Sequence, residues 1–570
     1  MAHATAKRLE VKVDDLDKAL ERIRSQIDEE DYQTLAGGVE ALAYLSAEIQ
    51  KKGASIRRLR QLIFGPSSEK TDEVRERLGE QKNEESGEEA GEEGSADSAG
   101  GEGSGKGQKK KRKGHGRNGV DAYPGAERID VSHDTLRPGD PCPIERCDGR
   151  VYRQKEPHYD LRVIGRSPIT ASVIARERLR CALCGVIFTA GLPPGAGEKK
   201  YDESVVAMIA YLRFGAGFPH YRLERIQESF GIPMPSSTQW ELIRDGALEI
   251  EAVFEQLIVI AAGGEVLHND DTPGKIIELI TENKERKKAI ESGEVVASSS
   301  KNKNPEDRTA IYTSGVISVT EDGHRIALFF TGREHAGENL ARVLEKRPEE
   351  LPAPIHMSDG LAANTPGELA RIIANCLVHA RRHFVEVAEN FPDEVLFILE
   401  CLKLVYRYDE EAKKASMTPE ERLLYHQEKS APVMKKIEEW LDRQIADKLV
   451  EPNSGLGEAI RYMQKRWDAL TLFLRKPGAP LDNNIVERGL KKAILHRNNS
   501  RFYKTKNGAR VGDLYTSLIH TAELAGADPF HYLTELLRHA AEARECPAEW
   551  MPWNYLETLE RLKSRAPPGE

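Results

Sequence analysis

Apolar side chains near the start of the chain recur at three- and four-residue steps, which is the spacing of amphipathic helices. The first of these runs consists of Leu9, Val13, Leu16 and Leu20. The pattern is interrupted near Gly37–Gly38 and then resumes. We therefore expect a helical segment over residues 1–70. It could be a helical hairpin or a dimerising coiled coil, although its heptads are not sustained.

The pattern changes several times further along the chain. A length of 570 residues exceeds that of a usual single domain, so several domains are expected. The successive regions are turn-rich with short strands (120–196), helical (197–262), alternating strand and helix (263–385), helical (386–476), a loop followed by one helix (477–512), and helical again (513–570). This succession predicts a multidomain α+β protein.

Residues 71–119 differ in composition from both of their neighbours. They contain few large apolar side chains, and they are acidic over residues 72–105 and basic over residues 106–117. Such a composition cannot offset the entropy lost on ordering, so we expect a disordered linker. The basic run KKKRKGHGRNG (Lys109–Gly119) is either a solvated tail or an arm that contacts DNA phosphates, because clustered Lys and Arg release counterions from DNA.

Composition narrows the class of protein further. Hydrophobic residues make up 39% of the chain and charged residues 31%, so the chain can build cores but also carries solvated stretches. The apolar run near Leu257–Gly264 is far shorter than the ~20 residues of a membrane span. The charged N-terminus lacks the apolar core of a secretory signal. We therefore expect a cytoplasmic protein that is not associated with a membrane.

Two pairs of cysteines fall within the turn-rich region. The four residues are Cys142, Cys147, Cys181 and Cys184. Two turn-borne pairs can supply the four thiolates of a tetrahedral zinc ion, so the pattern predicts a structural zinc site in a domain over residues 120–196. Buried free cysteines and a redox pair are the alternatives. The seven cysteines of the chain are an odd number, which argues against a disulfide framework.

Acidic residues end two of the strands expected between residues 263 and 385. The expected order is three strands, a helix, a strand, a helix over Thr365–Ala374, and a strand that turns into a helix. This order is that of a ribonuclease-H-like fold, in which the first and fourth strands are neighbours. The carboxylates of Asp270 (or Asp271) and Asp359 would then converge, which favours a site for hard divalent cations.

A third acid lies far downstream, in LDNNIVERGLKKAILHRNNSRFY (Leu481–Tyr503). Glu487 falls in the first turn of the helix expected there, where an acid also suits the helix dipole. If this Glu belongs with the other two acids, residues 386–476 form an all-helical insertion between the fifth strand and the helix that carries Glu487.

Four blocks of sequence resemble transposases of the insertion-sequence 66 family, a branch of the DDE superfamily. They are LRQLIFGPSSEK (Leu59–Lys70), HNDDTP (His268–Pro273), CLVHARRHF (Cys376–Phe384) and DNNIVERGLKKAILHRNNSRF (Asp482–Phe502). The C-terminal run SLIHTAELAGADPFHYLTELL is similar as well. The family's Asp-Glu-Thr motif reads Asp270-Asp271-Thr272 here, and the charged segment 275–307 stands where the first hairpin would continue.

The resemblance implies a DNA transposase that binds the ends of an insertion sequence, then cleaves and joins DNA strands. Asp270, Asp359 and Glu487 would hold two Mg²⁺ or Mn²⁺ ions. The partners implied are terminal inverted repeats, target DNA, a second copy of the chain and helper proteins, in a bacterial cell where the protein would associate with the nucleoid. The alternatives are a catalytically inactive zinc-dependent DNA-binding protein and a ribonuclease-H-like nuclease without strand transfer.

Basic side chains in three regions are the expected contacts to DNA, because phosphates are bound mainly by Lys and Arg. They are Lys109, Lys110, Lys111, Arg112, Lys113 and Arg117 of the arm, Arg381 and Arg382 after the fifth strand, and Arg488, Lys491, Lys492, Arg497 and Arg501 along or just past the Glu487 helix. A solvated helix face is the alternative reading for the last group.

Overall fold

The computed structural model describes residues 199–292 and 308–565 without a break, together with shorter stretches between residues 135 and 197 and the single residues Arg22, Arg24 and Tyr32. The predicted N-terminal helical segment, the linker and the basic arm, Lys109 to Arg117, therefore lie outside the described residues, apart from those three. The chain divides into two compact units. One consists of Met1–Glu89, Leu192–Leu223 and Pro235–Glu570, and the other of Ala90–Gly191 and Glu224–Met234.

The smaller unit contains one antiparallel strand pair in its described part, β1 (Arg178–Arg180) with β2 (Ile187–Thr189). Another contact within this unit joins residues about 60 positions apart. The buried side chain of Gln227 donates to the carbonyl of Ile169 at 2.9 Å and accepts from the Ser167 hydroxyl at 2.9 Å. The residues that link β1 to β2 include Cys181 and Cys184, which lie outside the described residues, as does Cys142.

In the described part of the larger unit, several helices precede the sheet. Their bounds are α4 (Glu203–Ala210), the π-helix η2 (Tyr211–Gly215), α6 (Ser236–Glu249) and α7 (Glu251–Ala262); α5 (His220–Ser229) crosses from one unit to the other. The Asp202 side chain caps α4 by accepting from the Ser204 amide at 2.9 Å. Along α7, apolar side chains at Val253, Leu257 and Ala261 are fully buried, as the four-residue spacing predicts.

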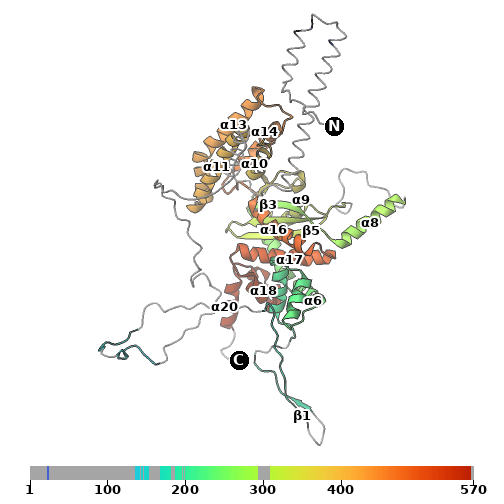
Figure 1. The fold of residues 1–570 in the computed structure, drawn as a ribbon, viewed down its shortest axis with the longest axis vertical. Coiled ribbons are helices and arrows are strands. Elements are labelled where there is room, and N and C mark those ends of the chain that lie inside the picture. The colour runs from blue at the N-terminus through green and yellow to red at the C-terminus, as the bar shows by residue number, and fades with distance from the viewer. Residues whose placement is uncertain are drawn as a thin grey trace, which may run out of the picture. The chain divides into compact units, whose positions relative to one another are not determined.

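A five-stranded mixed sheet forms the centre of the larger unit (Figure 1). Its strands are β3 (Val266–Pro273), β4 (Tyr312–Val319), β5 (Arg325–Gly332), β6 (Ile355–Ser358) and β7 (Ile372–Asn375), in the spatial order β5-β4-β3-β6-β7. The first and fourth strands pair in parallel, so their predicted adjacency is confirmed. The α+β class is confirmed with it. The helix expected after the hairpin is present as α9 (Ala336–Leu344).

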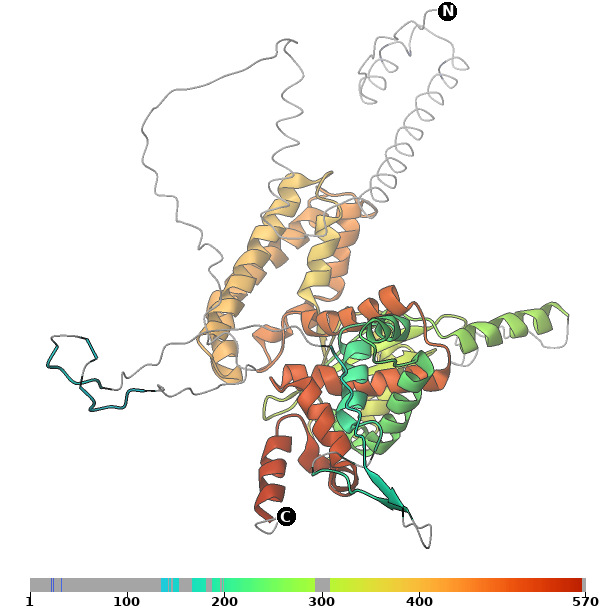
Figure 2. The ribbon, with the colours of Figure 1, turned by 60° about the horizontal axis from the view of Figure 1, so that its bottom comes forward.

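The prediction of a helix over Thr365–Ala374 is wrong. Residues 359–371, all of them described, contain a short 3₁₀-helix η4 (Ala362–Asn364) and no α-helix, and Ile372 already belongs to β7. Thr365 is extended because Pro366 follows it, and Gly367 has a left-handed φ of 64°. Conversely, the charged segment after residue 275 contains α8 (Ile277–Glu291), which projects away from the sheet (Figures 1 and 2).

The residues expected as an insertion are helical and share a hydrophobic core with β6, β7 and α10 (Leu377–Val385). The helices are α11 (Pro392–Lys414), α12 (Pro419–Lys429), α13 (Ala431–Ala446), α14 (Gly455–Lys465), α15 (Trp467–Leu470) and η5 (Leu472–Leu474). They run side by side as a bundle (Figure 2). Trp440 and Trp467 are partly buried against this core.

On β5, a strand at the edge of the sheet, a helix takes the place of a further strand. The amides of Ala327, Phe329 and Thr331 donate to the side chains of Thr521, Ser517 and Asp513, at 3.1, 2.9 and 2.7 Å. These acceptors follow one another at four-residue steps along α17 (Lys506–Leu524). Four helical residues rise about 6 Å and two strand residues about 6.7 Å, so the two rows match.

The chain ends in α18 (Pro529–Arg538), α19 (Ala540–Glu545), the 3₁₀-helix η6 (Pro547–Trp550) and α20 (Tyr555–Arg565). In the described part of the chain, none of the helices combines the length and the apolar character needed to cross a bilayer.

Asp513 generates a prediction about stability. Burial raises the pKa of its carboxyl to about 8, against the hydrogen bonds from Thr331 that lower it. Because the folded state holds this proton more tightly than the unfolded state, stability decreases as the pH rises from about 4 to 8. Asp513→Asn keeps an acceptor for the Thr331 amide and should melt higher than the wild type at pH 8. Asp513→Ala should lose about 1–3 kcal/mol. Thermal melts of both variants at pH 5 and pH 8 test this, and equal shifts at the two pH values would contradict it.

Candidate active site

Asp270 and Asp271 are adjacent on β3 and therefore point to opposite faces of the sheet. Asp271 is committed to packing on its face. Its carboxylate accepts from the Ser314 hydroxyl at 2.7 Å, from the Ala336 amide at 3.0 Å, and lies 3.0 Å from Nδ1 of His335. These contacts fix the start of α9 to the sheet. The side chain of Asp270 is left for the other face.

Asp359 comes directly after β6, and the strand register brings it level with Asp270. His268 on β3 pairs with Met357 on β6. Asp270 and Asp359 each follow two positions later, so the parallel register places them side by side. One Asp359 oxygen, Oδ1, accepts from the Leu361 amide at 2.9 Å and from Nδ2 of Asn364 at 2.9 Å. The same Asn364 nitrogen lies 3.4 Å from Oδ1 of Asp270. The two carboxylates thus face one shared donor.

Glu487 reaches the same place from the first turn of α16 (Asn484–Ser500). This helix packs on β4 at Gly315, where a Cβ atom would lie 3.0 Å from Leu490 and 3.1 Å from Val486. Gly315 is the partner of Asp270 in the strand register. A larger residue at this position would push the helix away, so the missing side chain allows Glu487 to approach Asp270.

Asn483 anchors the start of the Glu487 helix. Its fully buried side chain donates to the carbonyl of Asn269 at 3.0 Å and lies 3.0 Å from Nδ1 of His268, so it ties the helix to β3. Its amide donates to Sγ of Cys376, 3.3 Å away, just after β7. Burial lowers the pKa of His268 to about 4, so this ring is neutral at physiological pH. One Asn therefore fixes α16 to two strands.

The electrostatics of Asp270 indicate that the other two acids lie near it, although the ligand atoms of the three do not all lie within 4.8 Å of one another. Its pKa is raised to about 6, first by burial and then by the negative charges of Asp359, Glu487 and Asp271. Asp359 is itself buried, and Oε1 of Glu487 is buried without a hydrogen-bond partner among the described residues. Oxygen ligands grouped in this way fit a hard divalent cation such as Mg²⁺.

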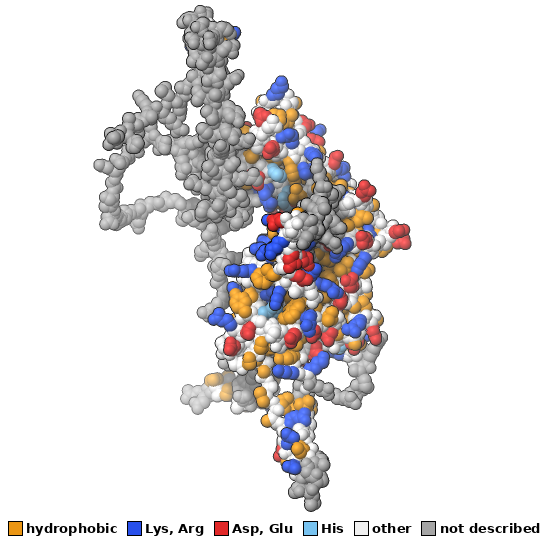
Figure 3. Space-filling view, turned by 90° about the vertical axis from the view of Figure 1, so that its right-hand side faces the viewer, with side chains coloured by type: hydrophobic (Ala, Val, Ile, Leu, Met, Phe, Trp, Pro, Cys, Tyr) orange, Lys and Arg blue, Asp and Glu red, His pale blue; other side chains and the backbone are white. Residues whose placement is uncertain are grey.

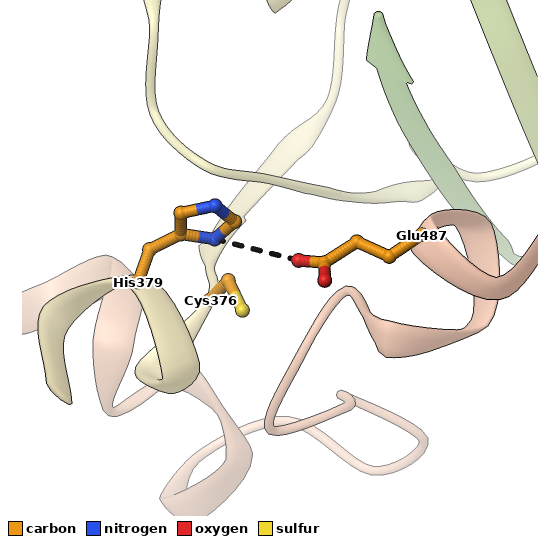
Figure 4. Close-up of side chains that lie close together, drawn as sticks. All are labelled: Cys376, His379 and Glu487. Carbon is orange, nitrogen blue, oxygen red and sulfur yellow. Dashed lines mark ion pairs between the residues drawn. The ribbon is translucent and has the colours of Figure 1, made fainter. Parts of the chain in front are cut away.

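A second set of donors borders Glu487 (Figure 4). The ligand atoms of Cys376, His379 and Glu487 lie within 4.8 Å of one another, and Nδ1 of His379 is 3.9 Å from Oε1 of Glu487. Burial raises the pKa of the Cys376 thiol to about 11, which keeps it protonated at neutral pH. The three acids supply only oxygen ligands, which suit a hard divalent cation better than a set that includes a thiol.

The helical insertion holds the Asp359 turn from outside the sheet. The Tyr462 hydroxyl donates to the carbonyl of Asp359 at 2.8 Å, and Arg466 donates to the carbonyl of Gly360 at 3.3 Å. The Arg466 guanidinium lies over the Tyr462 ring, 4.1 Å from its centroid. Gly360 has a φ of 78°, a left-handed conformation that a side chain would strain. Sequence patterns gave no signal for these contacts.

The predicted DNA contacts fall into two groups in the described part of the chain. Lys492 pairs with Glu523 at 2.9 Å, Arg497 donates to Thr272 at 3.0 Å, and Arg381 is buried. These three have packing contacts that the sequence did not indicate. Arg488, Lys491 and Arg501 are exposed and Arg382 is half-buried. On the face in Figure 3, Lys and Arg are interspersed with Asp and Glu.

Of the four predicted zinc ligands, Cys147 is the one in the described part of the chain, and it is exposed. The zinc site therefore stays a prediction, and the assignment of DNA contacts does so too.

Substitutions of Asp270 and Asp271 should change the free energy of unfolding in opposite directions. Because the pKa of Asp270 is raised, the stability of the metal-free protein falls as the pH rises through about 6. Asp270→Asn should therefore raise the free energy of unfolding at pH 8 by about 1–3 kcal/mol and have little effect at pH 4. Asp271→Ala should lower it by about 1–3 kcal/mol at both, since it leaves the Ser314 and Ala336 donors unpaired. Denaturant unfolding with a chelator present measures both, and a destabilised Asp270→Asn protein at pH 8 would refute the assignment.

Tyr462→Phe tests the contact between the insertion and the Asp359 turn. Loss of the hydroxyl should lower stability by about 0.5–1.5 kcal/mol and raise the Mn²⁺ concentration needed to saturate the protein, because the Asp359 backbone loses a donor. Tyr406→Phe is the matched control, since its hydroxyl is buried in the same insertion without a hydrogen-bond partner among the described residues. Manganese titrations of both variants should separate them; identical titrations would show that the contact is only structural.

Comparison with known proteins shows to which protein family the chain belongs. The model of the family described as Transposase IS66 family matches residues 199–511. The chain is similar to proteins of Sinorhizobium fredii (strain NBRC 101917 / NGR234) that are described as uncharacterized. It is 25% identical to y4hP over 394 residues, 67% of each chain, and 34% identical to y4jD over 187 residues, 32% of this chain and 36% of y4jD. With y4qI it shares 25% identity over 372 residues, 62% of each chain. The family match spans more than half of the chain and includes all three acids, so the chain belongs to the IS66 family of transposases.

Proposed function

We propose that the protein is a DDE-type DNA transposase that cleaves and joins DNA strands at a two-cation centre formed by Asp270, Asp359 and Glu487. One observation carries the proposal: Asp270 and Asp359, from segments far apart in the sequence, share the Asn364 donor, and the negative charge of Glu487 acts on Asp270. Family membership supports it. The strand order β5-β4-β3-β6-β7, with the first strand central and the first acid on it, supports a ribonuclease-H-like core.

The three carboxylates would hold two Mg²⁺ or Mn²⁺ ions, which would activate a nucleophile and stabilise the leaving oxygen at phosphorus. The work of the chain is to hold these oxygens in place and to orient the DNA. Asp271 keeps α9 fixed, and Asn483 sets the position of Glu487. The exposed Arg488 and Lys491 on the Glu487 helix could contact phosphates next to the scissile bond. No Ser or Tyr nucleophile is required by this chemistry.

Recognition of the DNA ends is proposed for the parts that precede the catalytic region. Cys142, Cys147, Cys181 and Cys184 would bind a structural Zn²⁺ ion, and β1 and β2 flank the second pair. The arm from Lys109 to Arg117 would add contacts to phosphates. The protein would act as a homo-oligomer on terminal inverted repeats and target DNA, in the bacterial cytoplasm at the nucleoid, with helper proteins from the same element.

Cleavage and joining of end DNA test the proposal. Asp270→Ala, Asp359→Ala and Glu487→Ala should each abolish Mg²⁺-dependent nicking and strand transfer, a loss of at least about 10³-fold, and leave end binding nearly unchanged. Asp271→Asn is the matched control and should keep activity. Cleavage without joining would favour a nuclease. End binding without cleavage by the wild type, in Mg²⁺ or Mn²⁺, would favour a DNA-binding protein that no longer cuts.

A further inference from the structure

The side chain of Asn364 lies between Asp270 and Asp359. No pattern in the sequence had pointed to this residue. It is 2% exposed. Its amide nitrogen is 2.9 Å from Oδ1 of Asp359 and 3.4 Å from Oδ1 of Asp270. Ionised carboxylates only accept hydrogen bonds, so the nitrogen and not the oxygen of the amide must face them. The neutral amide of Asn364 thus directs its two N–H bonds toward the space between the two carboxylates, where a bound cation would lie.

The backbone of Asn364 is held in place. Its carbonyl accepts from Nδ2 of Asn269 at 2.8 Å, and the Asn269 side chain is fixed in turn by His356 at 2.8 Å. The next residue, Thr365, packs against Gly337 of α9, where a Cβ atom would lie 2.4 Å from the Thr365 carbonyl oxygen. The amide can still rotate about its last side-chain bond, because that torsion has a broad energy profile.

The amide oxygen of Asn364 gives a second, independent indication that this side chain binds a ligand. It is buried and has no hydrogen-bond partner among the described residues. A buried polar atom left unpaired is unfavourable for folding, so its presence at a site indicates a partner of another kind. Amide oxygens are common ligands of Ca²⁺, and carbonyl oxygens in general suit hard cations such as Mg²⁺ and Mn²⁺. A half-turn of the amide would bring this oxygen to the side of the two carboxylates.

We propose that Asn364 is a fourth ligand of the cation centre and that it changes its role with occupancy. Without a cation, its nitrogen faces Asp270 and Asp359 and offsets their repulsion. With a cation, the amide turns and its oxygen coordinates the ion. This inference rests on the cation centre of the proposed function, but it does not depend on DNA cleavage.

Manganese binding to the full-length protein without DNA tests the proposal, with free Mn²⁺ measured by electron paramagnetic resonance and stability measured by thermal melts. Asn364→Ala should weaken Mn²⁺ binding by at least about tenfold. Asn364→Asp supplies an oxygen but no N–H group. It should melt below the wild type when metal-free, bind Mn²⁺ at least as tightly as the wild type, and show the larger rise in melting temperature on adding Mn²⁺.

Asn339→Ala is the matched control. Asn339 is also 2% exposed and donates to Ser314 at 2.9 Å on the Asp271 side, so this variant should lose stability and keep wild-type Mn²⁺ binding. Wild-type Mn²⁺ binding by Asn364→Ala would overturn the proposal. Weak binding by Asn364→Asp would show that the amide acts only as a donor, and would overturn its role as a ligand. A wild type that binds Mn²⁺ but never cleaves DNA would refute the transposase activity alone.

Discussion

Repulsion between three carboxylates in one partly buried site is the constraint on which the rest of the fold depends. Burial and neighbouring negative charge raise the pKa of Asp270 to about 6, so the site is unfavourable without a positive partner. The surrounding structure holds the acids together nevertheless. Parallel pairing of β3 with β6 aligns the first two, Asn483 ties the Glu487 helix to β3, and Asn364 places a donor between Asp270 and Asp359. The three acids therefore lower the free energy of unfolding of the metal-free protein, and a bound cation would offset that loss.

The helical insertion and the C-terminal helix α17 support the sheet at its two opposite edges. The insertion shares a core with β6 and β7, and it reaches the Asp359 turn through Tyr462 and Arg466. At the opposite edge of the sheet, α17 pairs its side chains with the amides of β5 and closes an edge that would otherwise be free to aggregate. The position of Asp359 is therefore linked to the packing of the insertion, although the two are distant in sequence.

Sequence patterns predicted the parts of this fold that follow from local periodicity and strand order. The adjacency of β3 and β6 was foreseen from the order of strands, and that adjacency brings Asp270 and Asp359 together. The helix expected over Thr365–Ala374 failed because Pro366 and Gly367 outweigh its apolar spacing. Asn364, Asn483 and Tyr462 were missed because single polar residues carry no periodic signal, and their roles depend on contacts across 94, 214 and 103 positions. The family resemblance already favoured Asp270 over Asp271, and the contacts that occupy Asp271 support that prediction.

The central claim is that the three acids form a centre for two divalent cations. The most direct measurement is anomalous X-ray diffraction at the manganese edge, from crystals of the protein grown with Mn²⁺. The account predicts two peaks roughly 4 Å apart, bounded by Asp270, Asp359 and Glu487. A single peak at Cys376 and His379, or no peak beside Asp270 at saturating Mn²⁺, would contradict it.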